Sequence, residues 1–184
     1  MELVIKNKLM SLTGGSKVLN EKGELVYKVK GSWASNTFSK KYKKTVVDLN
    51  KKVYYKVCNK RIHGLIKRSA LIYDASGNQV AKVTEGDILK GGYEIEGTTE
   101  KMDIIGRLIP EAEIKLAGKK IGTISIPGMK KVGPGYVVTH VTDQFKVTFD
   151  DPEDGPFMVA LVVAIDNIID AHQRSTRTHT APIH

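Results

Sequence analysis

The residues with the clearest chemical potential are cations gathered in one stretch of the chain. Between Lys40 and Arg68 the sequence holds 11 Lys or Arg residues and a single acid, Asp48, while the rest of the chain has a net charge of −1. Such a cluster attracts the phosphates of lipids or nucleic acids. The alternative is a solvated strand surface, because lysines commonly protect β-sheet edges. The candidate ligands for an anionic lipid are Lys40, Lys41, Lys43, Lys44, Lys51, Lys52, Lys60, Arg61, Lys67 and Arg68.

Aromatic residues are interleaved with these cations. Stacking combined with charge is how proteins grip single-stranded nucleic acid, and apolar anchors combined with charge suit a membrane surface. Side-chain alternation along strands would place most of these rings in the core, so we regard nucleic acid as an unlikely partner. The rings are Trp33, Phe38, Tyr42, Tyr54 and Tyr55.

The nucleophiles and histidines do not form a recognisable catalytic or metal-binding motif. The sequence has no HExxH motif, no nucleophile elbow, no phosphate-binding Gly-Lys-Ser/Thr loop and no dinucleotide fingerprint. Cys58 and His63 could pair as nucleophile and base, but a structural cysteine on a strand is favoured. We therefore expect no catalytic residues, no cofactor, no metal site and no enzymatic activity. The other histidines are His140, His172, His179 and His184.

Two groups of acids have a catalytic interpretation and a structural one. The run Asp150, Asp151, Glu153 and Asp154 could bind a hard cation, but it lacks the alternating pattern of a calcium loop and suits the positive end of a helix. Asp166 and Asp170 are one helical turn apart and could do acid–base work. The favoured interpretation is that they mark where the helix leaves the core. A buried Asp166 would need a partner, because an unpaired buried carboxylate is costly.

The element that must organise the fold is an apolar C-terminal helix, predicted near residues 156–170. Pro156 suits the first helical position, and Asp154 or Gly155 suits the cap. The ten residues 156–165 carry no polar side chain, and a helix that is apolar all round is buried on every side. It is too short for a bilayer, which needs about 20 residues. A valine-rich strand is the rival interpretation, but the length and spacing of the apolar residues favour a helix.

The remaining elements are expected to be short strands joined by turns, and one hairpin is repeated. Residues 18–29 align with residues 72–83, and both contain an Asx residue followed by glycine at the turn. Weaker echoes at 46–57 and 114–124 are attributed to chance resemblance between hairpins. A chain built of hairpins can bury an apolar helix completely only by wrapping around it. The sequence therefore predicts a mainly β protein, a closed antiparallel barrel with the helix inside.

Composition sets the remaining bounds. A chain of 184 residues fits one domain, predicted over residues 1–172, and the polar residues 173–184 are expected to form a mobile tail. We find no signal peptide and no membrane-spanning segment in the sequence. The single cysteine, Cys58, favours a reducing compartment, which predicts a cytoplasmic protein, peripheral at a membrane if it binds lipid.

Three segments of the chain resemble the LURP-one-related family. They are the opening strand with residues 6–12, the hairpin of residues 20–29 and the terminal helix that begins around residues 154–157 and reaches Asp166. The family belongs with the phospholipid scramblases and the tubby C-terminal domain in one structural superfamily. The resemblance covers roughly residues 1–172 and implies a barrel of about 12 strands around a hydrophobic helix.

What the resemblance implies for function is binding rather than catalysis. Tubby domains bind phosphoinositides through surface Lys and Arg residues, and scramblases associate with membranes and calcium. The first hypothesis is therefore a non-enzymatic module that binds anionic phospholipid head groups, phosphoinositides included, through the basic residues named above. The second is a protein-interaction or regulatory scaffold whose basic patch meets an acidic partner. The third is an enzyme with an unrecognised site, which a polar pocket of converging acids or histidines would support.

Overall fold

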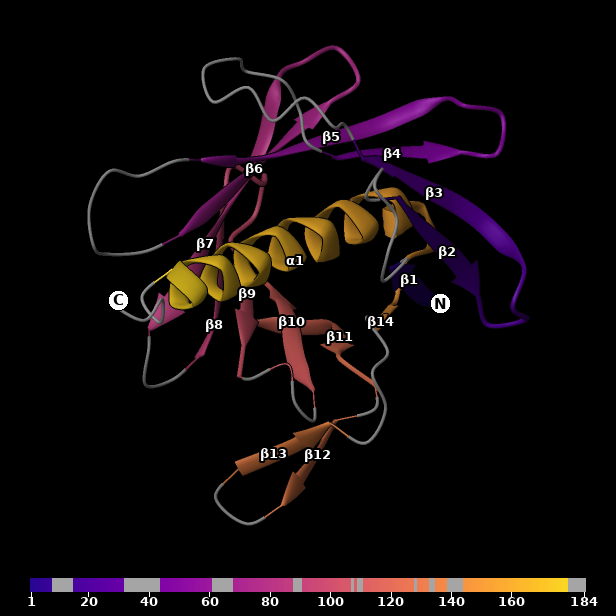
Figure 1. The fold of residues 1–184 in the computed structure, drawn as a ribbon. Coiled ribbons are helices and arrows are strands. Elements are labelled where there is room, and N and C mark those ends of the chain that lie inside the picture. Colours follow the sequence, from indigo (N-terminus) through magenta and orange to yellow (C-terminus); the bar gives the residue numbers. More distant parts are fainter. Residues whose placement is uncertain are drawn as a thin grey trace.

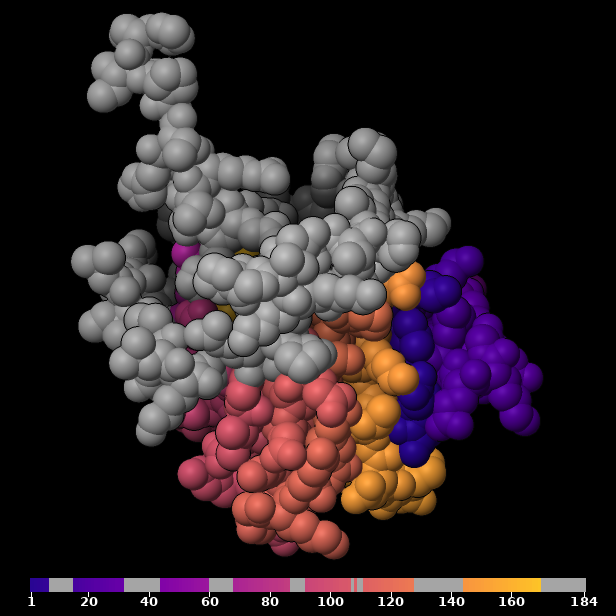
Figure 2. All heavy atoms as spheres, turned by 90° about the horizontal axis from the view of Figure 1, so that it is seen from below, coloured from indigo at the N-terminus to yellow at the C-terminus, as the bar shows by residue number. Residues whose placement is uncertain are grey.

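The fold is seen in a computed structural model, which describes residues 1–7, 15–31, 44–60, 68–87, 91–106, 108, 111–127, 129–132, 135–138 and 144–178. Twelve of its strands form one closed antiparallel barrel, in the order β1-β14-β11-β10-β9-β8-β7-β6-β5-β4-β3-β2 (Figure 1). The barrel closes where β1 pairs with β14, so the N-terminal strand lies beside the last one (Figure 2). The predicted closed barrel of about 12 strands is confirmed.

Most strands are short and joined to their sequence neighbours. The barrel consists of β1 (Glu2–Asn7), β2 (Ser16–Asn20), β3 (Leu25–Gly31), β4 (Lys44–Asp48), β5 (Val53–Lys60), β6 (Ser69–Asp74), β7 (Gln79–Asp87), β8 (Gly91–Glu96), β9 (Met102–Ile105), β10 (Ala112–Leu116), β11 (Lys119–Ser125) and β14 (Gln144–Phe149). Two further strands, β12 (Met129–Val132) and β13 (Gly135–Val138), form a separate two-stranded sheet between β11 and β14.

The helix α1 (Gly155–Thr178) runs through the barrel and supplies the centre of the core (Figure 1). Every side chain from Met158 to Ile165 is at most 3% exposed. The barrel wall meets it with the inward half of each alternating strand, for example Leu3 and Ile5 of β1 and Ile72 of β6, all at most 1% exposed. An all-apolar helix surface is thereby removed from water on every side, which is the outcome that the sequence predicted.

The helix begins differently from the expectation. Pro152–Asp154 form a 3₁₀ turn ahead of α1, and the Asp151 side chain caps that turn by accepting a hydrogen bond from the Glu153 N–H at 2.9 Å. Gly155 has helical dihedral angles, with φ −47° and ψ −52°, and Asp154 lies inside the turn. Neither of the two predicted capping residues caps it. The extra turn moves the cap upstream of Pro152, where the proline lacks the N–H that would need a partner.

The helix also extends beyond its predicted end at residue 170. It continues through Thr178, because intrahelical hydrogen bonds can propagate past the last buried side chain. Residues 179–184 lie outside the described part of the chain. The mobile tail expected for residues 173–184 stays a prediction, with the first six of these residues in helical conformation.

Three hairpins of the barrel share one turn geometry. In each turn, the backbone N–H of the first residue donates to the carbonyl of the fifth residue, at 2.9–3.1 Å. The side-chain oxygen of the first residue accepts a hydrogen bond from the backbone N–H of the fifth residue, at 2.8–2.9 Å. The fourth residue has positive φ. The repeated hairpin is confirmed, and the echo at 46–57 is the same turn rather than a chance resemblance. The turns are 20–24, 48–52 and 74–78, with Gly23, Lys51 and Gly77 at φ 78°, 68° and 96°.

The hairpin β10–β11, which contains the other weak echo at 114–124, does not share this turn. Between β10 and β11 only two residues turn the chain, Ala117 and Gly118, both at positive φ. This is the compact two-residue connection that matches strand twist. The weak echo at 114–124 is therefore a generic hairpin, as expected.

Antiparallel pairing sorts the loops between the two ends of the barrel. The three equivalent turns lie at the end where α1 begins, since Tyr55 near the second turn packs its ring on Phe157 of the first helical turn, with centroids 5.7 Å apart. We call this the helix-start end. The opposite end is called the helix-exit end. There β3 and β5 finish and β4 and β6 begin, so that Gly31 pairs with Lys44 and Lys60 with Ser69.

Candidate functional site

The barrel divides the basic segment that the sequence singled out. Lys51 and Lys52 lie in the turn at the helix-start end, whereas Lys44, Lys60 and Arg68 lie at the helix-exit end. Lys60 is separated from the turn by the length of β5, eight residues or about 26 Å, and Lys44 by the five residues of β4, or about 17 Å. The other predicted lipid ligands, Lys40, Lys41, Lys43, Arg61 and Lys67, lie outside the described residues.

Lys44 points into the barrel and not toward solvent. It shares the inward side of β4 with the buried Val46 and pairs across the strands with the buried Val57. Its Nζ lies 2.5 Å from Asp166 Oδ2 of α1, and both side chains are 15% exposed. Lys44 is thus the partner that a buried Asp166 required. An ammonium committed to an interior carboxylate is not available to an external anion.

The outer surface of β1, β2 and β3 carries a group of lysines that sequence analysis missed. Lys6, Lys17 and Lys28 are direct cross-strand neighbours, because Lys6 pairs with Lys17 and Lys17 pairs with Lys28. Lys30 follows two residues later on the same side of β3. All four side chains are exposed. We call Lys6, Lys17, Lys28 and Lys30 the lysine wall, which spans about 10 Å across the strands and about 7 Å along β3.

Several other lysines on the barrel surface pair with carboxylates, which the lysines of the wall do not do among the described residues. Lys146 pairs with Glu2 at 2.8 Å and Lys82 with Glu96 at 2.8 Å. Within the described part of the chain, no carboxylate forms an ion pair with any lysine of the wall. Like charges directly opposite one another on adjacent strands are destabilising. The wall is therefore a concentrated site of positive charge without internal compensation.

The lysines of the wall are visible in the sequence, but only the pairing register of β1, β2 and β3 shows that they are neighbours. Lys17 and Lys28 face each other only because the turn 20–24 is followed by a bulge at Val18 and Leu19. Lys6 joins them only through the pairing of β1 with β2. Local charge counting favoured residues 40–68, where the cations are dense along the chain rather than across strands.

The turn 48–52 presents a different combination of side chains at the helix-start end. Leu49 is 51% exposed, and Lys51 and Lys52 are exposed beside it. The Lys52 ammonium lies 4.8 Å from the centre of the Tyr54 ring, a cation–π contact. Tyr54 in turn meets the edge of Tyr27 at a centroid distance of 6.0 Å.

The electrostatics at this end are those of partly buried tyrosines and crowded acids. Burial raises the pKa of the Tyr27 hydroxyl, and the neighbouring Tyr54 and Asp48 raise it further. Burial also raises the pKa of the Asp154 carboxyl, with smaller contributions from Asp151 and Glu153. The acidic run lies in and just before the 3₁₀ turn Pro152–Asp154, ahead of the first turn of α1, at the end of the helix where the dipole favours negative charge. Among the described residues, no group of three or more His, Cys, Asp or Glu side chains could hold a metal ion.

Two residues of the predicted aromatic set lie at the helix-start end. Tyr55 packs against Phe157 and the core, whereas Tyr54, beside the β-bulge between β4 and β5, contacts Tyr27 and the Lys52 ammonium. Trp33, Phe38 and Tyr42 lie outside the described residues.

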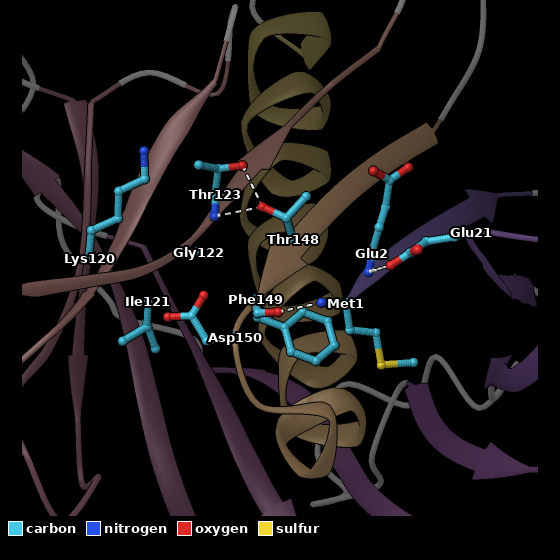
Figure 3. A pocket seen from close by; sticks show the side chains of 10 residues that line it. All are labelled: Met1, Glu2, Glu21, Lys120, Ile121, Gly122, Thr123, Thr148, Phe149 and Asp150. Carbon is cyan, nitrogen blue, oxygen red and sulfur yellow. Dashed lines mark hydrogen bonds between the residues drawn. The ribbon is translucent and has the colours of Figure 1, made fainter.

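A groove of about 670 Å³ opens at the helix-start end, between β1, β11 and β14 (Figure 3). Its polar groups bond mainly to one another: Thr123 and Thr148 share a hydroxyl contact of 2.9 Å, and the Glu2 N–H donates to Glu21 at 2.7 Å. Lys120 at its rim pairs with Glu113 at 3.3 Å. These contacts join strands of the wall, and we assign the groove a structural role.

The proposed nucleophile pair gains no geometric support. Cys58 is half-buried on β5 opposite Leu71, and His63 lies outside the described residues, as do His140, His179 and His184.

In the ranges that the structure covers, no helix has both the length and the apolar character needed to cross a bilayer.

Comparison with known proteins gives one finding. The family model described as LURP-one-related matches residues 1–166. No curated protein and no solved structure matches the chain. The matched region contains all twelve barrel strands and α1 as far as Asp166, so the resemblance covers the core except for its last residues on the helix, such as Ile168.

Proposed function

The chain belongs to the LURP-one-related family, and from that premise we propose that it is a non-enzymatic module that binds anionic phospholipid head groups at a membrane surface. The binding surface in this proposal is the lysine wall. The place of action would be the cytoplasmic leaflet, whose negative surface potential attracts clustered Lys and Arg residues.

The observation that carries the proposal is the row of three lysines in cross-strand register, with which no carboxylate of the described residues forms an ion pair. Each directly opposed pair of like charges opposes folding by a few tenths of a kcal/mol. A polyanionic surface removes that repulsion and gains about 1 kcal/mol for each lysine that approaches it. The wall is therefore better suited to a bound anion than to solvent alone.

The interior of the barrel supports binding rather than catalysis. α1 fills the space that a ligand-carrying barrel would leave open, and its side chains from Met158 to Ile165 are at most 3% exposed. Lys44 and Asp166, two charged groups that face inward, pair with each other. An external ligand must therefore meet the outer surface.

Vesicle co-sedimentation tests the proposal. Vesicles of phosphatidylcholine are compared with vesicles that also contain phosphatidylserine or a phosphoinositide, at low and at physiological salt. We expect binding only to the anionic vesicles, weakened by salt because exposed charges are screened. The double variant Lys17→Glu/Lys28→Glu should lower the affinity at least about tenfold.

A matched control separates the wall from net charge. Lys101→Glu/Lys119→Glu makes the same change in total charge at two exposed lysines, one just before β9 and one in β11, outside the wall and outside the turns 20–24, 48–52 and 74–78, and should leave vesicle binding nearly unchanged. Equal losses in both double variants would show attraction by net charge and overturn the wall as the site. Binding to polyglutamate but not to anionic vesicles would instead favour an acidic protein partner.

A further inference from the structure

The three equivalent turns offer an internal comparison, since the same backbone is built with different side chains. The second residue is Glu21, Leu49 or Ala75, and the fourth is Gly23, Lys51 or Gly77. The turn 48–52 is therefore the one of the three that combines a large apolar residue with a cation at the left-handed position.

Neither departure is explained by folding. Leu49 exposes 51% of its surface, although the polar Glu21 and the small Ala75 show that the backbone requires no leucine there. Lys51 adopts φ 68°, a conformation in which glycine avoids the clash of a side chain. Two unfavourable choices at the second and fourth places of one turn indicate a role outside the fold.

The turn lies close to the lysine wall. Lys28 of the wall pairs with Val47 of β4, and Leu49 directly follows the last residue of that strand. The hairpins β2–β3 and β4–β5 both extend beyond the start of α1 (Figure 1). Because Val47 is only 2% exposed, the accessible part of the wall is on β1 to β3, and the tip at Leu49 lies next to it.

Two acids near the tip are held in structural hydrogen bonds, and the acidic run 150–154 lies at the same end of the barrel beside the start of α1. Asp48 accepts the Lys52 N–H at 2.9 Å, and Glu21 accepts the Glu2 N–H at 2.7 Å. Lys51 and Lys52 are exposed on the turn itself. An apolar side chain next to such cations suits the boundary between head groups and acyl chains.

We propose that Leu49 is an apolar anchor that enters the interfacial layer of an anionic bilayer, while Lys51 and Lys52 remain at the level of the head groups. This inference rests on the proposed lipid binding and adds to it a hydrophobic contact with a specific location. Leu49→Ser should weaken binding to phosphatidylserine vesicles about tenfold, the effect of withdrawing one leucine from an apolar layer. Ala75→Ser, at the equivalent place of the third turn, should change nothing.

The fluorescence of an environment-sensitive label reports entry into an apolar layer, which electrostatic attraction to the vesicle surface alone would not produce. The native cysteine is first removed with Cys58→Ala, and a nitrobenzoxadiazole label is attached at Leu49→Cys or, as the matched control, at Ala75→Cys. With phosphatidylserine vesicles, label at position 49 should shift to the blue and become protected from an aqueous quencher. Label at position 75 should do neither.

The outcomes separate the anchor from the proposed function. Sedimentation with anionic vesicles but no blue shift at position 49 overturns the anchor and leaves the lysine wall as an electrostatic site. Equal shifts at positions 49 and 75 also overturn it, because the contact would then lack a specific location. Absence of sedimentation under every condition overturns both proposals, and a shift at position 49 produced by polyglutamate without lipid would assign the tip to a protein contact instead.

Discussion

Lysine side chains in the interior and on the outer surface of the barrel have opposite electrostatic surroundings. Lys44 is turned inward, is 15% exposed and has Asp166 as its partner, whereas Lys17 on the outer surface is exposed and has two further lysines as its neighbours. The interior charge is compensated within the protein, because an unpaired charge there would prevent burial of the helix. The outer charges are compensated by solvent or by a bound anion.

The largest contrast is expected between a buried and an exposed leucine. Leu161 of α1 has no exposed surface, so Leu161→Ala should reduce the free energy of unfolding by about 3 kcal/mol through lost burial and the cavity left behind. Leu49→Ala at the exposed turn should change it by less than about 0.5 kcal/mol. Urea denaturation measures both. Equal losses would contradict the assignment of α1 as the centre of the core.

The interior ion pair gives the next largest effect. Asp166→Ala leaves the Lys44 ammonium without its partner in a mostly buried place and should reduce the free energy of unfolding by about 2–3 kcal/mol. The double variant Lys44→Met/Asp166→Leu removes both charges and should recover most of that loss. If the double variant is as unstable as the single one in thermal or urea unfolding, the cost arises from packing and not from the stranded charge.

The turn comparison predicts a gain in stability. Lys51→Gly relieves the left-handed conformation at φ 68° and should raise the free energy of unfolding by about 1 kcal/mol. The reverse change in the first turn, Gly23→Lys, should lower it by a similar amount, since a Cβ at that position meets nothing within 4 Å and only the backbone conformation is strained. Unchanged stability in both variants would remove the argument that Lys51 is unfavourable for folding.

The smallest effect is expected in the lysine wall itself. Lys17→Gln removes the central charge of the row and should stabilise the protein by about 0.5 kcal/mol at low ionic strength. The gain should fade as salt is added, because exposed charges are screened. Lys119→Gln, at an exposed lysine outside the row, serves as the control and should have no such salt-dependent gain. A destabilising Lys17→Gln would show that the row is a packing feature rather than a site of repulsion.

Much of the architecture could be derived from particular residues. The ten apolar residues 156–165 required burial on all sides, and the Asx and glycine residues of 20–24 and 74–78 predicted two of the three equivalent turns. The turn 48–52 was harder to recognise from the sequence, because Lys51 occupies the place where the other two turns have glycine. The helix cap was misplaced, because an additional 3₁₀ turn at Pro152–Asp154 moved it to Asp151.

The candidate site was only partly accessible to such reasoning. Residues 40–68 were singled out because their cations are close along the chain, yet pairing turned Lys44 inward and separated Lys51 and Lys52 from Lys60 and Arg68 by the length of β5. The lysine wall was missed, because Lys6, Lys17 and Lys28 are neighbours only across strands.

By itself, the sequence determined the class of fold, because hydrophobic periodicity and turn chemistry are local and leave one way to bury an all-apolar helix among hairpins. The tertiary structure alone decided which charges meet. A single-residue change of register, such as the bulges beside the three turns, moves every following side chain to the other surface of the strand. Which lysine faces Asp166 and which faces another lysine therefore depends on cross-strand register, and that register is set by the closure of the whole barrel.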